Sequence, residues 1–150
     1  MNAVNSDLRI DRRVPMPALL AEAFESFRTA LNAAQLPGLR PSHYRVMSLI
    51  PQEGLQLSDL ARLAAITKAG TGQFIAHLRR EGYVLVDRNP ADQRAKIVTL
   101  TPLGAAAVRV SQNIIADTER LWAETLGADR YAELRLALTE VAALSEHEPG

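Results

Sequence analysis

The amino-acid sequence predicts a single, mainly α-helical domain that carries one small β-hairpin. Through most of the 150 residues, apolar side chains recur at the three- and four-residue spacing of a helix. Most prolines fall between these periodic stretches or at their starts, because helix interiors exclude proline. Between residues 83 and 100 the period changes to the alternation of strands. The length and the 47% hydrophobic content fit one folded unit, residues 1–150, with one core.

Two helices and a very short strand are expected in the first part of the chain. The first helix is marked by an apolar stripe at Leu20, Ala23, Phe24, Phe27, Ala30 and Leu31. Pro37-Gly38 ends it. Pro41 begins a second, short and largely buried helix that ends near Pro51 and Gly54. Residues 55–57 then form the short strand.

A pair of helices joined by a short turn follows. Leu60, Ala61 and Ala64 lie on one face of the first, and Thr67 is suited to cap the second, which runs from about residue 68 to 81. Gly82 stands where a left-handed residue ends helices. Two helices with so short a connection form a helix-turn-helix.

A β-hairpin comes directly after this pair, with strands at residues 83–88 and 95–100 around a polar tip at 89–94. A helix-turn-helix with such a hairpin is a winged helix-turn-helix, and we place this unit at about residues 38–101. The hairpin is its wing.

Long helices flank the winged unit, at about residues 15–36 and 102–145. Thr101-Pro102 begins a helix that continues to Leu126, Gly127 interrupts it, and a last helix carries apolar residues on one face. These helices have more apolar surface than a small winged domain can cover. We therefore expect them to be dimerisation helices, and a bundle within one chain is the alternative.

Composition excludes several functional classes. The chain has no cysteine, so it has no disulfide or thiolate metal site, and its three histidines are scattered, without a catalytic motif. We therefore expect no enzyme activity, catalytic residue, metal or cofactor. Because the first 13 residues are polar and no stretch could span a membrane, we expect a cytoplasmic protein without a membrane partner.

Charge is distributed unevenly although the chain is neutral overall. Residues 40–96 carry nine basic and five acidic side chains, whereas residues 117–148 carry three basic and eight acidic ones. The excess positive charge thus lies in the winged unit. It favours an anionic partner for that unit and is weak support by itself.

The order of elements and several local motifs resemble the multiple-antibiotic-resistance-regulator (MarR) family over roughly residues 15–145. The most specific motif comprises Gly82-Tyr83-Val84, Arg88, Asp92-Gln93-Arg94 and residues 98–104, Val-Thr-Leu-Thr-Pro-Leu-Gly. The Ile66-Thr67-Lys68 segment is also similar. The resemblance implies a homodimeric transcriptional regulator, most often a repressor, that binds a palindromic operator in double-stranded DNA. A winged-helix module that binds only proteins is the alternative.

The second helix of the pair is expected to enter the major groove, which admits one α-helix. The candidate contact residues are Thr67, Lys68, Gly72, Gln73 and His77. An amide at Gln73 can bond an adenine edge, Lys68 can reach a guanine or a phosphate, and Gly72 allows close backbone approach. Gly70 and Gly72 each cost this helix about 1 kcal/mol relative to alanine, so tertiary packing has to hold it.

At the wing, Arg94 is suited to a narrow minor groove, where negative potential attracts arginine. The resemblance implies that Asp92 orients Arg94 or Arg88 through a charge-assisted hydrogen bond. The family resemblance further implies a pocket for a small aromatic or phenolic effector between the dimerisation helices and the winged unit. Residues that could line this pocket are Phe27, His43, Tyr44 and Arg45, for which core packing is the alternative role.

Overall fold

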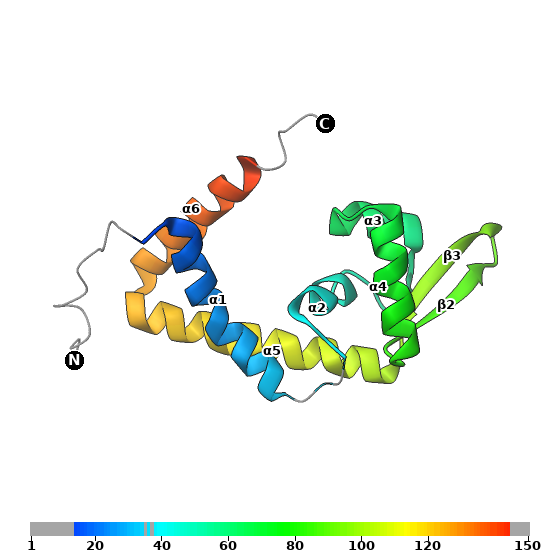
Figure 1. Ribbon diagram of the computed structural model, residues 1–150, viewed down its shortest axis with the longest axis horizontal. Helices are drawn as coiled ribbons and strands as arrows, with labels where there is room; N and C mark the ends of the chain where they lie inside the picture. The colour runs from blue at the N-terminus through cyan, green and yellow to red at the C-terminus, as the bar shows by residue number, and fades with distance from the viewer. Residues whose placement is uncertain (1–13, 35, 37, 145–150) are drawn as a thin grey trace.

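The computed structural model describes residues 14–34, 36 and 38–144 and has the predicted fold class, mainly α with a small β wing (Figure 1). The polar start of the chain, Pro37, His147 and the polar tail lie outside the described residues. The elements are α1 (Met16–Ala33), α2 (Pro41–Met47), β1 (Leu55–Gln56), α3 (Leu57–Ala64), α4 (Lys68–Arg80), β2 (Val84–Asn89), β3 (Asp92–Leu100), α5 (Pro102–Leu126) and α6 (Ala128–Leu144).

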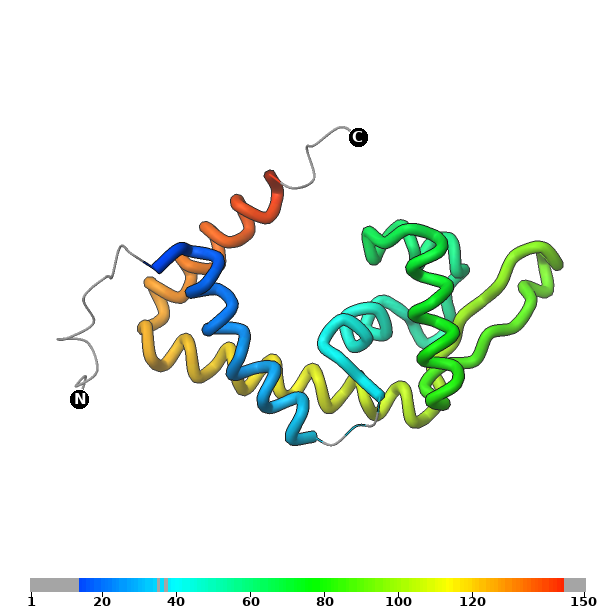
Figure 2. The backbone as a smooth tube through the Cα atoms, viewed as in Figure 1, coloured from blue at the N-terminus to red at the C-terminus, as the bar shows by residue number. Residues whose placement is uncertain are grey.

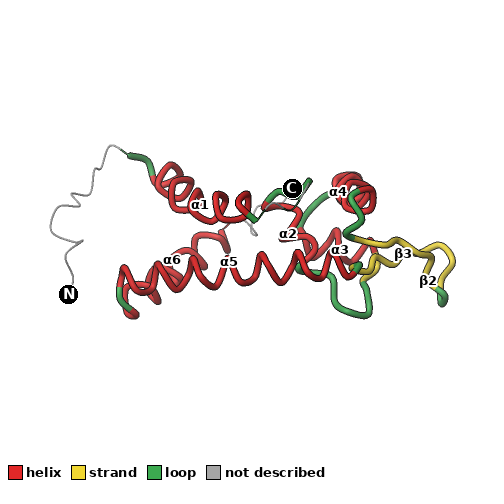
Figure 3. Tube along the Cα trace, turned by 90° about the horizontal axis from the view of Figure 1, so that it is seen from below, coloured by secondary structure: helices red, strands yellow, loops and turns green. Residues whose placement is uncertain are grey.

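The long helix α5 connects the two ends of the molecule. At one end it adjoins the winged unit of α2, α3, α4 and the sheet, and at the other it packs against α1 and α6 (Figure 2). The hairpin projects beyond the helices when the molecule is seen from below (Figure 3). The core is in the winged unit, where Met47, Leu60, Leu78 and Val98 are fully buried. No helix in the described part of the chain is long and apolar enough to cross a membrane.

The sheet is antiparallel in the order β1-β3-β2. The expected strand at residues 55–57 exists and pairs Leu55 with Val98. The prediction of a polar tip at 89–94 was too long, because β3 already begins at Asp92 and only Pro90-Ala91 separate the strands. The register passes from Arg88↔Lys96 to Asn89↔Asp92, so residues 93–95 form a bulge. A projecting two-stranded ribbon has both faces in solvent, so its outer part lacks the alternation that marks a strand in sequence.

The predicted boundaries at Thr67, Gly82, Thr101 and Gly127 are confirmed, whereas α1 and α2 end earlier than predicted, at Ala33 and Met47. The Thr67 hydroxyl accepts a hydrogen bond from the Gly70 N–H at 3.1 Å, and the Thr101 hydroxyl accepts one from the Gly104 N–H at 3.0 Å. Gly82 and Gly127 have φ angles of 81° and 82°, the left-handed region that glycine adopts without strain. These caps fix where α4 and α5 begin, and so fix the geometry of the winged unit.

Candidate nucleic-acid interface

Helix α4 has one buried and one exposed face. Thr71, Ile75 and Leu78 point into the core of the winged unit. The opposite face begins with Lys68, Ala69, Gly72, Gln73 and Ala76 and continues to the exposed Arg79 and Arg80; in its first half the side chains are small apart from Lys68 and Gln73. The sequence motif did not single out Ala69 and Ala76, although their spacing from Gly72 and Gln73 places them on this face. A helix with so flat a face can approach a second surface closely.

The two glycines of α4 differ in their surroundings. A Cβ atom on Gly70 would lie 2.8 Å from the Ile66 Cγ2 atom and 3.1 Å from the Thr67 hydroxyl, so packing within the chain favours glycine there. A Cβ atom on Gly72 would have no neighbour within 4 Å. Packing in this chain therefore gives no reason for glycine at position 72, despite its cost of about 1 kcal/mol in helix propensity.

A cationic cleft of about 290 Å³ lies between the start of α4, the start of α3 and strand β3. Its lining residues are Leu57, Ser58, Lys68, Arg94, Ala95 and Lys96. The structure thus brings together Lys68 and Arg94, which sequence motifs 26 positions apart had singled out separately. Three cations and no carboxylate line this cleft, which gives it the charge that a phosphate backbone requires. Ser58 was missed from sequence, since a serine at the start of a helix is common.

Asp92 acts on Arg94 through the backbone. Its Oδ1 atom accepts a hydrogen bond from the Arg94 N–H at 3.0 Å, and the expected bond to a guanidinium is absent from the described residues. The reason is the bulge at residues 93–95, which turns the Arg94 N–H towards the Asp92 carboxylate. Arg88 and Arg94 are both exposed, so their guanidinium groups face solvent at the wing.

The ring of His77 is directed at α2 and away from the exposed face of α4. It is stacked on His43, and both of its nitrogens form contacts within the chain, with the Gly38 carbonyl at 2.6 Å and with Arg80 at 2.8 Å. These contacts hold the ring although residue 77 lies only one turn after Gln73 along the helix. We therefore leave His77 out of the interface with DNA.

A second cavity, of about 510 Å³, lies between α1, α2 and α5 and is mostly apolar. It is lined by Phe24, Phe27, Pro41, Ser42, Tyr44, Arg45, Ser48, Ser111, Gln112 and Ile115. Three of the four residues expected in an effector pocket are therefore together. The fourth, His43, is absent from this lining because it lies on the face of α2 that meets α4. Arg45 also donates a hydrogen bond to the Ala64 carbonyl at 2.7 Å, at the end of α3.

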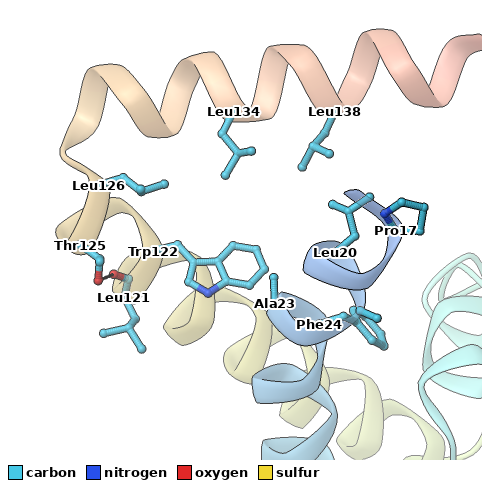
Figure 4. Close-up of a pocket in the computed structure, with 11 residues that line it drawn as sticks. Pro17, Leu20, Ala23, Phe24, Leu121, Trp122, Thr125, Leu126, Leu134 and Leu138 are labelled. Atoms are coloured by element: carbon cyan, nitrogen blue, oxygen red, sulfur yellow. Dashed lines mark hydrogen bonds between the residues drawn. The ribbon is translucent and has the colours of Figure 1, made fainter. Parts of the chain in front are cut away.

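An apolar groove of about 870 Å³ lies between α1, the end of α5 and α6 (Figure 4). Leu20, Trp122, Leu134 and Leu138 extend into it from these helices. None of the described residues of α6 is buried, and Leu136, Val141 and Leu144 are 61%, 59% and 72% exposed. So much exposed apolar surface is unusual for a stable monomer.

The fold and the cationic cleft define a winged helix-turn-helix DNA-binding protein. No family model matches the chain. The transcriptional regulator HosA of Escherichia coli O111:H- is 32% identical to it over 108 residues, which are 65% of this chain and 80% of HosA. The chain belongs to the MarR family of transcriptional regulators, a family without enzyme activity.

Solved structures have the same fold at low identity. The repressor CouR bound to a 23-mer DNA duplex superposes with a TM-score of 0.72 at 23% identity, covering 91% of this chain and 99% of CouR. MarR superposes with a TM-score of 0.69 at 19% identity, covering 91% of this chain and 95% of MarR. The PcaV regulator of Streptomyces coelicolor in complex with its natural ligand superposes with a TM-score of 0.71 at 20% identity, covering 91% of this chain and 98% of PcaV.

Proposed function

We propose that this DNA-binding regulator is a homodimeric repressor whose operator is a palindrome. Helix α4 enters the major groove and the wing reaches the adjacent minor groove. The observation that carries this assignment is the cleft that joins Lys68 of α4 to Arg94 and Lys96 of the wing. A duplex lying along this cleft meets three cations while the flat face of α4 faces the base edges.

The apolar groove and the geometry of operators support the proposed homodimer. Each protomer offers one α4, and reading a palindrome requires two such helices one turn of DNA apart. The groove between α1, α5 and α6 leaves Leu134 and Leu138 more than a third exposed in the single chain. A second copy covers this surface and sets the spacing of the two recognition helices.

The cavity lined by Phe27, Tyr44 and Arg45 is assigned to a small aromatic or phenolic effector. Its apolar walls and few polar groups suit such a molecule, and 510 Å³ is sufficient volume. PcaV, a structural neighbour, was solved with its natural ligand. Arg45 contacts both this cavity and the end of α3, so occupation of the cavity is expected to displace the helix-turn-helix and release DNA.

Selection of bound duplexes from genomic fragments tests this proposal directly. Enrichment of fragments that share a palindrome, with affinity that falls steeply as salt rises, supports the operator assignment, because neutralising phosphates releases counterions. Repression is then tested by a reporter gene behind the selected fragment. If no fragment is enriched and binding to duplex DNA is absent at low salt, a module that binds only proteins is the better description.

Arg94→Ala is expected to weaken operator binding about tenfold and to lower the slope of affinity against salt by about one unit, because one phosphate or minor-groove contact is lost. The melting temperature should stay the same, since Arg94 is exposed. Fluorescence anisotropy titrations at several salt concentrations measure both quantities. Arg130→Ala, an exposed arginine of α6 at the opposite end of the molecule, is the control. Equal affinities for the two variants would contradict the role of the wing.

Gly72→Ala is expected to stabilise the fold by up to about 1 kcal/mol and yet to weaken operator binding about tenfold. The added Cβ meets nothing within the chain and improves helix propensity, but it occupies the face that approaches DNA. Thermal unfolding and anisotropy measure the two effects. Gly70→Ala, whose Cβ points towards Ile66, is the matched control and should affect stability more than binding. Unchanged affinity in Gly72→Ala would show that α4 does not approach DNA through this face.

A further inference from the structure

Two histidines from different helices are stacked at the rear of the recognition helix. The rings of His43 on α2 and His77 on α4 have centroids 4.7 Å apart and planes 18° apart. Phe74 of α4 packs edge-on against His43 at 5.2 Å. His43 is buried, and its ring contacts two residues of α4. The stack therefore contributes to the position of α4 relative to the rest of the winged unit.

The hydrogen bonds around the stack require both rings to be neutral. The His43 Nδ1 atom accepts from the Arg40 backbone N–H at 2.9 Å. The His77 Nδ1 atom faces an Arg80 nitrogen at 2.8 Å, and a guanidinium only donates, so this ring nitrogen accepts. The His77 Nε2 atom consequently carries the proton and donates to the Gly38 carbonyl at 2.6 Å. A second proton on the His43 ring would place an Nδ1–H group against the Arg40 N–H, and one on the His77 ring would place an Nδ1–H group against the Arg80 guanidinium.

The charges around the stack also oppose protonation. Arg40 precedes α2 and acts on His43, while Arg80 of α4 contacts His77 directly. Glu81 is the nearby carboxylate, and its Oε1 atom lies 3.3 Å from the Arg80 Nε atom, which offsets part of that positive charge. Burial, then His77 and then Arg40 lower the pKa of His43 below its ordinary 6.5. Two imidazolium rings stacked at this distance would repel each other as well.

We propose that the His43–His77 stack is a proton-sensitive latch that positions the recognition helix, and that protonation of the buried His43 ring releases α4 and weakens DNA binding. His43 and His77 are thus positioning residues that act on DNA through α4. The effect on DNA rests on the function proposed above, whereas the latch itself is a property of the folded chain.

The sign of the pH dependence follows from linkage. A histidine with a lowered pKa in the folded chain binds fewer protons there than in the unfolded chain. Its contribution to stability is complete above the ordinary pKa of 6.5 and is lost as the pH falls from that value towards the folded pKa. Acidification therefore weakens the latch. A histidine that contacted phosphate would behave oppositely, because its protonation would strengthen binding.

The latch is tested first without DNA, on the full chain. NMR titration of the histidine ring protons, assigned by His43→Gln, His77→Gln and His147→Gln, should show the His43 signal titrating below the ordinary histidine range. Chemical unfolding from about pH 7.5 to about pH 5.5 should show a loss of stability that is smaller in His43→Gln, because the introduced amide does not titrate. Titration of the His43 ring in the ordinary histidine range would overturn the latch, even if the variants unfold.

The effect on DNA is tested with a fluorescein-labelled random-sequence duplex at constant ionic strength. From about pH 7.5 to about pH 5.5, wild-type affinity should fall roughly fivefold, and His43→Gln should lose most of this dependence. His147→Gln, which alters a histidine outside the described structure, is the matched control and should behave like wild type. Affinity that rises on acidification would overturn the latch. Absence of binding at every pH would count against the proposed function instead, while the titration and unfolding data still judge the latch.

Discussion

Replacing Leu134 and Leu138 together by glutamate is expected to convert the protein into a monomer of about 16.4 kDa and to weaken operator binding at least about a hundredfold. Both side chains extend into the apolar groove between α1, α5 and α6 (Figure 4). Two carboxylates there would have to lose their hydration on association, without a partner charge in the groove lining. Light scattering at micromolar concentration measures the mass, and anisotropy measures operator affinity.

The loss of affinity follows from the two-fold geometry. A monomer reads one half-site, so it loses the second recognition helix and the high effective concentration that dimerisation gives it. Leu103→Glu is the control, because Leu103 is 48% exposed at the start of α5 and lies outside both the groove and the cationic cleft. A double variant that remains a dimer would mean that another surface joins the protomers, and a wild-type monomer would exclude the homodimer outright.

Gly104→Ala is expected to destabilise the fold by about 3 to 5 kcal/mol, the range of severe core substitutions. A Cβ on Gly104 would lie 2.0 Å from the Tyr83 carbonyl oxygen and 3.3 Å from the Leu100 Cδ2 atom. The Tyr83 carbonyl cannot move away freely, since it accepts hydrogen bonds from the Thr101 N–H at 3.0 Å and from the Thr101 hydroxyl at 3.2 Å. The first turn of α5 and the start of the wing would therefore have to separate.

Chemical unfolding monitored by circular dichroism measures this loss, and Gly72→Ala is the control, because its Cβ enters open space. If the two alanine variants were equally stable, the close approach of α5 to the Tyr83 carbonyl would not limit the choice of residue at position 104. The same contact gives a physical reason for the Thr-Pro-Leu-Gly segment at residues 101–104. The Thr101 hydroxyl caps α5 and also donates a hydrogen bond to the Gly82 carbonyl at 2.7 Å. Gly104 allows the first turn of α5 to lie against the Tyr83 carbonyl.

The helices were predictable because their signals are local. Caps at Thr67 and Thr101 and left-handed glycines at positions 82 and 127 act within a few residues of the boundary that they set. Helices α1 and α5 were equally predictable from the spacing of their apolar residues, since one face of each packs on other helices. The wing was harder, because its projecting strands are solvated on both faces, and β3 began earlier than expected.

The candidate site was predictable residue by residue but not as an arrangement. Sequence motifs selected Lys68 and Arg94, yet only the tertiary packing of α3, α4 and the sheet places them in one cleft with Ser58. His43 and His77 were assigned to two different sites, and the structure stacks them on each other. Whether a polar residue on a short helix faces solvent or another element depends on which element packs there. The local sequence does not identify that element.

The sequence by itself therefore determined the mainly helical fold, the helix-turn-helix, the wing and the family, because periodicity, caps and the motif at residues 82–104 are properties of adjacent residues. Only the tertiary structure decided that a Cβ at position 104 would meet the Tyr83 carbonyl while a Cβ at position 72 would meet nothing, and that the cations of α4 and the wing share a cleft. These features arise where segments distant in sequence meet, and their distances are set by the packing of the whole domain.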